Sequence, residues 1–367
     1  MPGAVKTEHA DRADYFFKCN TKFPLCSPSC SATFFWLNTL KPIFQLVLFC
    51  LIILVVPILI GNGLFPKQPF DNKPLEELRE RRPDFVFIGN SMLITRLDEA
   101  RLSELLGGAG VMALTEHGMA SAGYWLVFKN YVIESGIRPK VVIIFFRDFD
   151  LSWPLYRTTG IYREKLEPFM RKEEPVLEYV WEQSPKNWKD RIGEKLEDIY
   201  PIQRRKTEAE DMIREVALDW TDHPWKKDSK LLGEVNDTFQ LRELREDVPT
   251  ELATTEEFSL EKFDPSPQRS FMPHIVEEAR KHNITVCFYR VKRRPPRDAD
   301  FRKESRALTR YMPTLKAWVE EQGMLFYDAS RDPAEHLGMY ADGDHLDEKY
   351  MREWTEIFHK QLQDILK

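Results

Sequence analysis

Short apolar segments alternate with amphipathic ones along most of this chain from residue 83 to the C-terminus. The first apolar segment, 83–88, is rich in β-branched and aromatic residues and is followed by glycine, which is typical of a buried parallel strand. Further predicted strands cover residues 110–114, 141–146, 284–289 and 324–328. Predicted helices cover residues 97–106, 273–281, 305–322 and 348–366. This alternation predicts an α/β fold in which helices flank both faces of a parallel sheet.

The pattern changes between residues 154 and 267, where charge and tryptophan are dense and no convincing buried strand occurs. We interpret 154–267 as a helical insertion packed beside or over the end of the sheet that carries the candidate site. Its tryptophans could stack on sugar rings, although packing within a helical cap is the simpler interpretation. They are Trp181, Trp188, Trp220 and Trp225. The charge runs are interpreted as solvated faces.

A long apolar run near the N-terminus contains no charged residue from residue 42 to 66. A helix of about 20 residues covers the roughly 30 Å hydrocarbon core of a bilayer. A cleavable signal peptide is the competing interpretation, but residues 1–41 precede the run and no clear cleavage pattern follows it. We therefore predict an N-terminal tail, a retained transmembrane signal anchor, a linker and an α/β domain. Their bounds are 1–41, 42–65, 66–82 and 83–367.

Charge and cysteine content exclude some classes of protein. The net charge of −6 and the lack of a basic stripe with interleaved aromatic residues argue against nucleic-acid binding. Only Cys287 follows the apolar run, so the predicted domain cannot hold an internal disulfide. Cys19, Cys26 and Cys30 precede the run without a fourth ligand at convincing spacing, and we interpret them as reduced thiols rather than a metal site.

Two short stretches carry candidate chemistry. The Gly-Asn-Ser stretch that ends in Ser91 directly follows the first predicted strand. Open α/β sheets bind ligands at the carboxyl ends of such strands, where the N-terminus of the next helix favours negative charge. His345, in Asp-Gly-Asp-His, precedes the last predicted helix and could take the proton of Ser91, while Asp342 orients the imidazole. Each stretch alone has a simpler interpretation. Gly-x-Ser often follows a strand, and the acidic loop could be an exposed turn or part of a calcium or other metal site.

Taken together and in this order, the two stretches resemble the SGNH/GDSL family of esterases and acyltransferases. The resemblance implies a flavodoxin-like parallel sheet, a triad of Ser91, His345 and Asp342, and no cofactor or metal. It also implies a backbone oxyanion donor in the loop after the second strand, for which Gly118 is the first choice and Gly123 the reserve.

The sequence departs from the family pattern at two positions. Asn90 stands where the family has aspartate, and Arg147 stands where the family has asparagine after the third strand. A guanidinium could donate to an oxyanion or bind an anionic substrate group, but it cannot reproduce the geometry of a neutral amide. These departures favour a divergent branch of the family, and they leave open a non-catalytic member.

The predicted anchor adds a second resemblance, to the DltD proteins of teichoic-acid D-alanylation and, more distantly, to alginate O-acetylation proteins. It implies an extracytoplasmic domain in the bacterial periplasm or at the cell surface and a membrane-bound O-acyltransferase partner. The expected substrate is an acylated glycan or polymer of the envelope, processed through an acyl-serine intermediate. A catalytically degenerate binding or assembly protein is the alternative. A cytoplasm-facing enzyme of lipid metabolism is a third, because basic residues flank the span evenly.

A basic cluster follows the fourth predicted strand. It could be a solvated loop or could complement an anionic headgroup or polymer. Its members are Arg290, Lys292, Arg293, Arg294 and Arg297.

Overall fold

The computed structural model describes residues 44–56, 58–59, 67–184, 192–193, 195–196, 266–297 and 299–367. The chain divides into two compact units, 1–56 and 57–367, and the second contains the sheet. The predicted tail 1–41, with Cys19, Cys26 and Cys30, lies outside the described residues.

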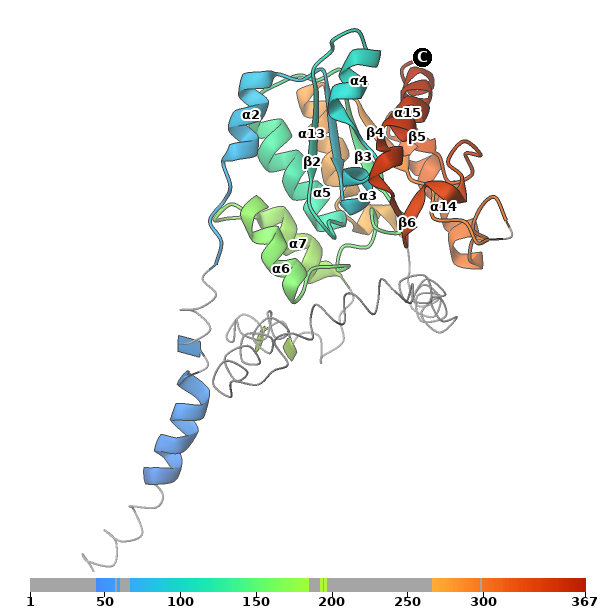
Figure 1. Cartoon of the computed structure of the whole chain (residues 1–367). Coiled ribbons are helices and arrows are strands. Elements are labelled where there is room, and N and C mark those ends of the chain that lie inside the picture. Colours follow the sequence, from blue (N-terminus) through green and yellow to red (C-terminus); the bar gives the residue numbers. More distant parts are fainter. Residues whose placement is uncertain are drawn as a thin grey trace, which may run out of the picture. The chain divides into compact units, whose positions relative to one another are not determined.

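Five parallel strands form the sheet in the order β2-β1-β3-β4-β5 (Figure 1). They are β1 (Phe85–Gly89), β2 (Val111–Thr115), β3 (Val141–Phe146), β4 (Val286–Arg290) and β5 (Leu325–Asp328). The predicted parallel α/β fold is therefore confirmed, and the order is that of flavodoxin-like sheets. In this order the chain runs from β1 to β2 at one edge and then crosses over β1 to β3, from which it continues toward the other edge. A crevice at the carboxyl ends of β1 and β3 is the usual ligand site of such sheets.

Both faces of the sheet are covered, which explains the uninterrupted apolar runs of its strands. Side chains alternate between two separate cores, because successive residues of a strand point to opposite faces. Val86 and Ile88 contribute to the core with α2, α5, η1, α13 and α14. Phe85 and Phe87 contribute to the core with α4 and α15. The helices are α2 (Lys73–Arg81), α4 (Glu99–Leu105), α5 (Ser121–Val127), the π-helix η1 (Phe128–Ile133), α13 (Met272–His282), α14 (Arg306–Glu321) and α15 (Met351–Ile365).

Part of the predicted linker 66–82 is a helix of the second unit. Helix α2 buries Leu75 and Leu78 in the first core, and Pro74 occupies its first turn. The predicted insertion begins with α6 (Ile161–Leu166), the 3₁₀ helix η2 (Glu167–Phe169) and α7 (Pro175–Gln183). Trp181 of α7 is buried in the core, and its Nε1 donates to the carbonyl oxygen of Pro154 at 3.2 Å. Trp188, Trp220 and Trp225 lie outside the described residues.

The predicted membrane anchor is described only in part. Residues 44–56 and 58–59 are helical, and most of their large apolar side chains are exposed. Both ends of the predicted span 42–65 lie outside the described residues. None of the described helices has the length and apolar character that crossing a membrane requires.

Candidate active site

Ser91 begins the short helix α3 (Ser91–Ile94) at the carboxyl end of β1. Gly89 ends that strand, and a Cβ there would lie 2.7 Å from Leu93 Cβ, so glycine permits the close approach of strand and helix. Asn90 caps α3, because its Oδ1 accepts a hydrogen bond from the Met92 N–H at 3.1 Å. These contacts place Ser91 at the end of the sheet where the fold predicts a ligand crevice.

Asn90 is buried and also anchors the loop after β2. Its Nδ2 donates to the carbonyl oxygen of Met119 at 3.3 Å and to the hydroxyl oxygen of Tyr124 at 3.4 Å. An ionised aspartate cannot donate to the Met119 carbonyl oxygen, although it can accept a hydrogen bond from the Tyr124 hydroxyl. The hydrogen bond to Met119 therefore explains why asparagine, rather than aspartate, suits position 90 in this chain.

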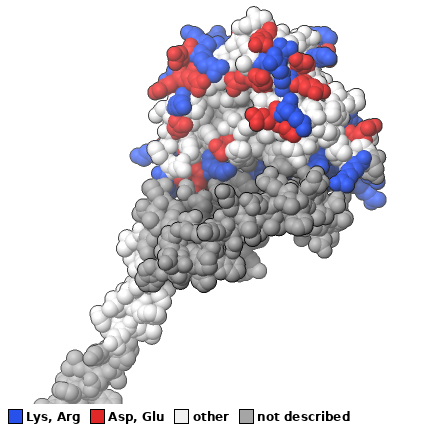
Figure 2. Space-filling view, viewed as in Figure 1, with Lys and Arg blue, Asp and Glu red and all other residues white. Residues whose placement is uncertain are grey.

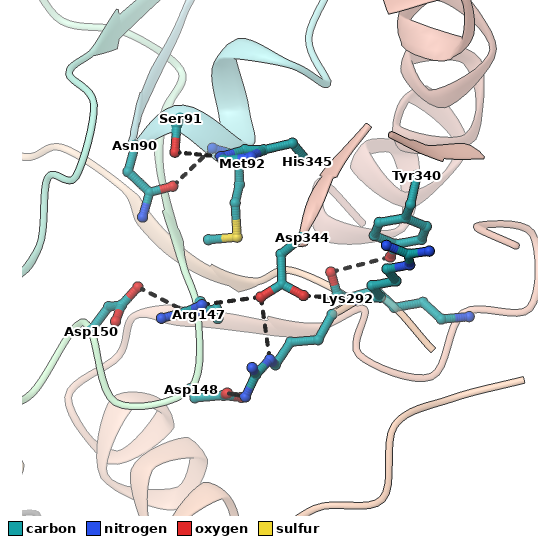
Figure 3. A network of polar contacts seen from close by, with 12 residues as sticks. Asn90, Ser91, Met92, Arg147, Asp148, Asp150, Lys292, Tyr340, Asp344 and His345 are labelled. Carbon is teal, nitrogen blue, oxygen red and sulfur yellow. Dashed lines mark hydrogen bonds and ion pairs between the residues drawn. The ribbon is translucent and has the colours of Figure 1, made fainter. Parts of the chain in front are cut away.

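His345 reaches Ser91 from a hairpin formed by β6 (Tyr340–Asp342) and β7 (His345–Leu346). The two side chains point toward one another in Figure 3, and His345 Nε2 lies 2.8 Å from Ser91 Oγ. A neutral imidazole with its proton on Nδ1 can accept the hydroxyl proton in this geometry. The structure thus brings together two candidate residues that are 254 positions apart in the sequence.

Asp342, the third predicted member of the triad, pairs with His345 through the backbone of the hairpin. Its side chain is outside the part of the chain that the structure describes. The role of Asp342 therefore stays a prediction.

Two residues directly after α3 hold the peptide groups on both sides of His345. Arg96 is fully buried, and its Nη1 donates to the carbonyl oxygens of Met92 at 3.2 Å and Asp344 at 3.0 Å. Thr95 Oγ1 accepts a hydrogen bond from the Leu346 N–H at 3.3 Å. The segment that carries Ser91 therefore also fixes the backbone that carries His345.

Glu335 compensates the buried charge of Arg96. Its Oε1 accepts hydrogen bonds from Arg96 Nη2 at 2.7 Å and from the Tyr340 hydroxyl at 2.5 Å. Its Oε2 accepts from Trp354 Nε1 at 2.8 Å. Both carboxylate oxygens are thus engaged and the charges are paired, as a buried ion pair requires, while Arg96 Nε has no hydrogen-bond partner among the described residues.

Arg147 follows β3 directly and is mostly buried, with 15% of its side chain exposed. Its Nη1 donates to Asp344 Oδ2 at 3.0 Å, and its Nε lies 3.9 Å from Asp150 Oδ2. Burial opposes the charge of Arg147, but the carboxylates of Asp150, Asp344 and Asp148 outweigh it and raise the pKa further. The sequence suggests the Arg147 guanidinium as a donor to an oxyanion or to a substrate, but part of this guanidinium is hydrogen-bonded within the protein.

Two buried aspartates beside this arginine were not predicted as site residues. Asp148 accepts hydrogen bonds from Arg290 Nη2 and Arg293 Nη1, each at 2.9 Å. Neither carboxylate oxygen of Asp150 accepts a hydrogen bond within the described residues, and burial raises its pKa to about 6. A sequence signal is present, because both aspartates lie within four residues of the end of a wholly apolar strand.

The members of the basic cluster at the end of β4 differ in their burial. Arg290 and Lys292 are buried, with Arg290 paired to Asp148 and the Lys292 ammonium donating to the carbonyl oxygen of Asp332 at 2.7 Å. The solvated-loop interpretation is wrong for these two residues. Arg297 is exposed and fits it.

At both glycines proposed as oxyanion donors, close packing leaves no room for a side chain. Gly118 has φ +78°, and a Cβ there would lie 2.5 Å from Tyr162 Cε1. Gly123 lies in α5, where a Cβ would lie 2.3 Å from Met119 Cγ. Their role toward an oxyanion stays a prediction. Among the described residues, no cluster of three or more histidine, cysteine or acidic side chains is placed to bind a metal ion.

Fold and site define an α/β protein with a serine–histidine pair at the carboxyl end of a central parallel strand. No family model matches the sequence, and no curated protein matches it. Among solved structures, the chain is similar to a crystal structure described as a "putative acylhydrolase" from Bacteroides fragilis NCTC 9343. The match has 10% identity and a TM-score of 0.32, and it covers 84% of this chain and 96% of that one. A likeness at this level assigns neither family nor activity.

Proposed function

We propose that this chain is a serine esterase or acyltransferase of the SGNH type. The observation that carries the proposal is the 2.8 Å separation of Ser91 Oγ and His345 Nε2 at the carboxyl end of β1. A serine hydroxyl is a weak nucleophile at its ordinary pKa, and an adjacent imidazole is the usual means of activating it. Arrangements of this kind are recognised by geometry and roles rather than by position in a sequence.

In the proposed mechanism, Ser91 Oγ attacks the acyl carbonyl carbon of an ester while His345 Nε2 takes the hydroxyl proton. The tetrahedral intermediate collapses as His345 returns that proton to the departing alcohol, which leaves the acyl group on Ser91. A water molecule or an acceptor hydroxyl then attacks the acyl-serine, and His345 takes its proton and returns it to Ser91. We assign the backbone N–H of Gly118 to the oxyanion and Asp342 to the imidazole, following the family resemblance.

The wider setting of the proposal rests on the apolar run 43–60. We propose a single-pass anchor in the lipid bilayer with the catalytic unit in the bacterial periplasm or at the cell surface. The substrates are then acylated glycans or polymers of the envelope, with acyl groups of the O-acetyl type, and a membrane-bound O-acyltransferase is the candidate partner. A reporter fused to the C-terminus that is active only in the cytoplasm would exclude this topology and favour the cytoplasm-facing enzyme of lipid metabolism.

Hydrolysis of p-nitrophenyl acetate by the full-length protein in detergent tests the catalytic proposal. We expect Ser91→Ala and His345→Gln each to lower kcat by at least about 10³-fold, as loss of the nucleophile or the base does in triad enzymes. Ser103→Ala is the matched control, because Ser103 lies on α4 and donates to the carbonyl oxygen of Ala109. Equal hydrolysis by wild type and Ser91→Ala contradicts the proposal.

One observation favours a second candidate, a catalytically degenerate protein that binds or assembles envelope material on the same fold. Arg147 stands in place of the family asparagine and donates to Asp344, so the neutral amide that the family has after the third strand is absent. A wild-type protein without serine-dependent hydrolysis, but with the same fold, supports this candidate.

A further inference from the structure

The residue before His345 is held by its side chain as well as by its backbone. Asp344 Oδ1 accepts a hydrogen bond from the Arg294 N–H at 2.9 Å, and Oδ2 accepts one from Arg147 Nη1 at 3.0 Å. Arg293 Nε lies 3.3 Å from the same Oδ2. Figure 3 shows the side chains of Arg147 and Asp344 pointing toward one another.

The groups that hold Asp344 follow two neighbouring strands of the sheet. Arg147 directly follows β3, which pairs with β1, the strand that leads to Ser91. Arg293 and Arg294 follow β4, which pairs with β3. Arg293 is itself held by Asp148 at 2.9 Å. The ion pairs of Asp344 therefore join the β6–β7 hairpin to the ends of two neighbouring strands.

Solvent screens this contact only weakly. The Asp344 side chain is 10% exposed and that of Arg147 is 15% exposed. Burial raises the pKa of Asp344, but Arg293, Arg147 and the Arg294 N–H outweigh burial and lower it to about 2. Asp344 is therefore ionised throughout the physiological range, and the pairing persists there.

We propose that Asp344 and Arg147 form a positioning pair that sets the distance between the His345 imidazole and Ser91. Arg147 serves the site through Asp344 and not as a direct donor to the oxyanion. The expected change in kcat rests on the proposed function, whereas the expected change in the distance between Ser91 and His345 does not. Arg96 and Thr95 tie the hairpin backbone to α3, and the Asp344 carboxylate ties the same hairpin to the sheet.

The kinetic consequence follows from the sensitivity of proton transfer to distance. A displacement of about 1 Å at a catalytic group can lower the rate about 10²-fold. We expect Asp344→Asn and Arg147→Met to lower kcat by about 10- to 100-fold while KM changes little, because neither residue is assigned a contact with substrate. Arg147→Lys retains the charge and should retain most of kcat. The double variant Asp344→Asn/Arg147→Met should lose no more kcat than the more impaired single variant, because the contact that Arg147→Met removes is one that Asp344→Asn also weakens.

The matched control is Asp328→Asn, which removes a carboxylate from the same ionic network at Arg290 and not at the hairpin. It should leave kcat within about 2-fold of wild type. The inference is overturned if either single variant keeps the wild-type kcat. A loss for Arg147→Met that far exceeds that for Asp344→Asn, or losses that add in the double variant, also overturns it, because Arg147 then acts on substrate directly.

A crystal structure of Asp344→Asn supplies a readout that does not depend on activity. We expect the separation of Ser91 Oγ and His345 Nε2 to exceed hydrogen-bond reach, whereas an unchanged 2.8 Å overturns the inference. If the wild type lacks serine-dependent hydrolysis, the proposed function fails, and this structure still decides the positioning role. A thermal melt of each variant confirms that the compared proteins are folded.

Discussion

Asp150 is a buried carboxyl group whose ionisation opposes folding, and replacing it with asparagine tests the electrostatics of the site. The residue is 1% exposed, and its nearest cationic contact is Arg147 Nε at 3.9 Å. Burial is the largest influence and raises its pKa from 3.8 to about 6, despite Arg147 and Arg157, with Asp148 adding repulsion. Asparagine keeps the shape of the side chain and removes its charge.

The sign follows from proton binding in the two states. Between pH 3.8 and about 6 the unfolded chain releases the proton of Asp150 while the folded protein retains it, so stability falls as the pH rises. Each pH unit in this interval corresponds to about 1.4 kcal/mol, and the whole interval to about 3 kcal/mol. The penalty is complete above pH 6 and absent below pH 3.8. We therefore expect Asp150→Asn to be more stable than wild type by up to about 3 kcal/mol at pH 7.5 and nearly equal at pH 3.8.

Urea unfolding of the full-length protein in detergent, at both pH values, measures this difference. Asp364→Asn is the control, because Asp364 forms an exposed ion pair with Lys367 and should change stability by less than about 1 kcal/mol. A variant Asp150→Asn that is less stable than wild type at pH 7.5 would refute the reasoning. That result means that the charge of Asp150 is a net stabilising partner of Arg147.

Two further changes test the surroundings of the site. Glu335→Gln leaves the buried guanidinium of Arg96 without its counter-charge and should lower the free energy of unfolding by about 3–5 kcal/mol, against less than about 1 kcal/mol for the exposed Glu356→Gln. Equal losses in urea unfolding contradict the assigned role of the pair. Gly118→Ala places a Cβ against Tyr162 at a positive φ and should lower stability by about 1–2 kcal/mol. An unchanged melting temperature shows that the loop adjusts freely.

The strands and the serine–histidine pair could be predicted because their signals are local in the sequence. A strand buried on both faces, such as β3, is a continuous apolar run. Ser91 and His345 each adjoin such a local signal, and the parallel topology then brings the ends of the strands together. The hairpin that carries His345 replaces the expected loop.

The ionic contacts around the site could not be predicted in the same way. Arg147 and Asp344 are 197 positions apart, and nothing in their flanking sequence specifies that they pair. Helix α2 was not predicted. Only two of its residues, Leu75 and Leu78, are buried, and two apolar positions are too few to distinguish a helix from a charged linker. The burial of Arg290 was missed because a basic cluster after a strand is usually solvated.

Labelling of the full-length protein with a fluorophosphonate probe, followed by peptide mass spectrometry, tests the central claim most directly. The probe forms a covalent adduct with a serine that is activated by a base. We predict one adduct on Ser91 in the wild type and its loss in His345→Gln. A folded wild-type protein whose Ser91 stays unlabelled, under conditions that fully label a serine esterase in the same sample, contradicts the claim.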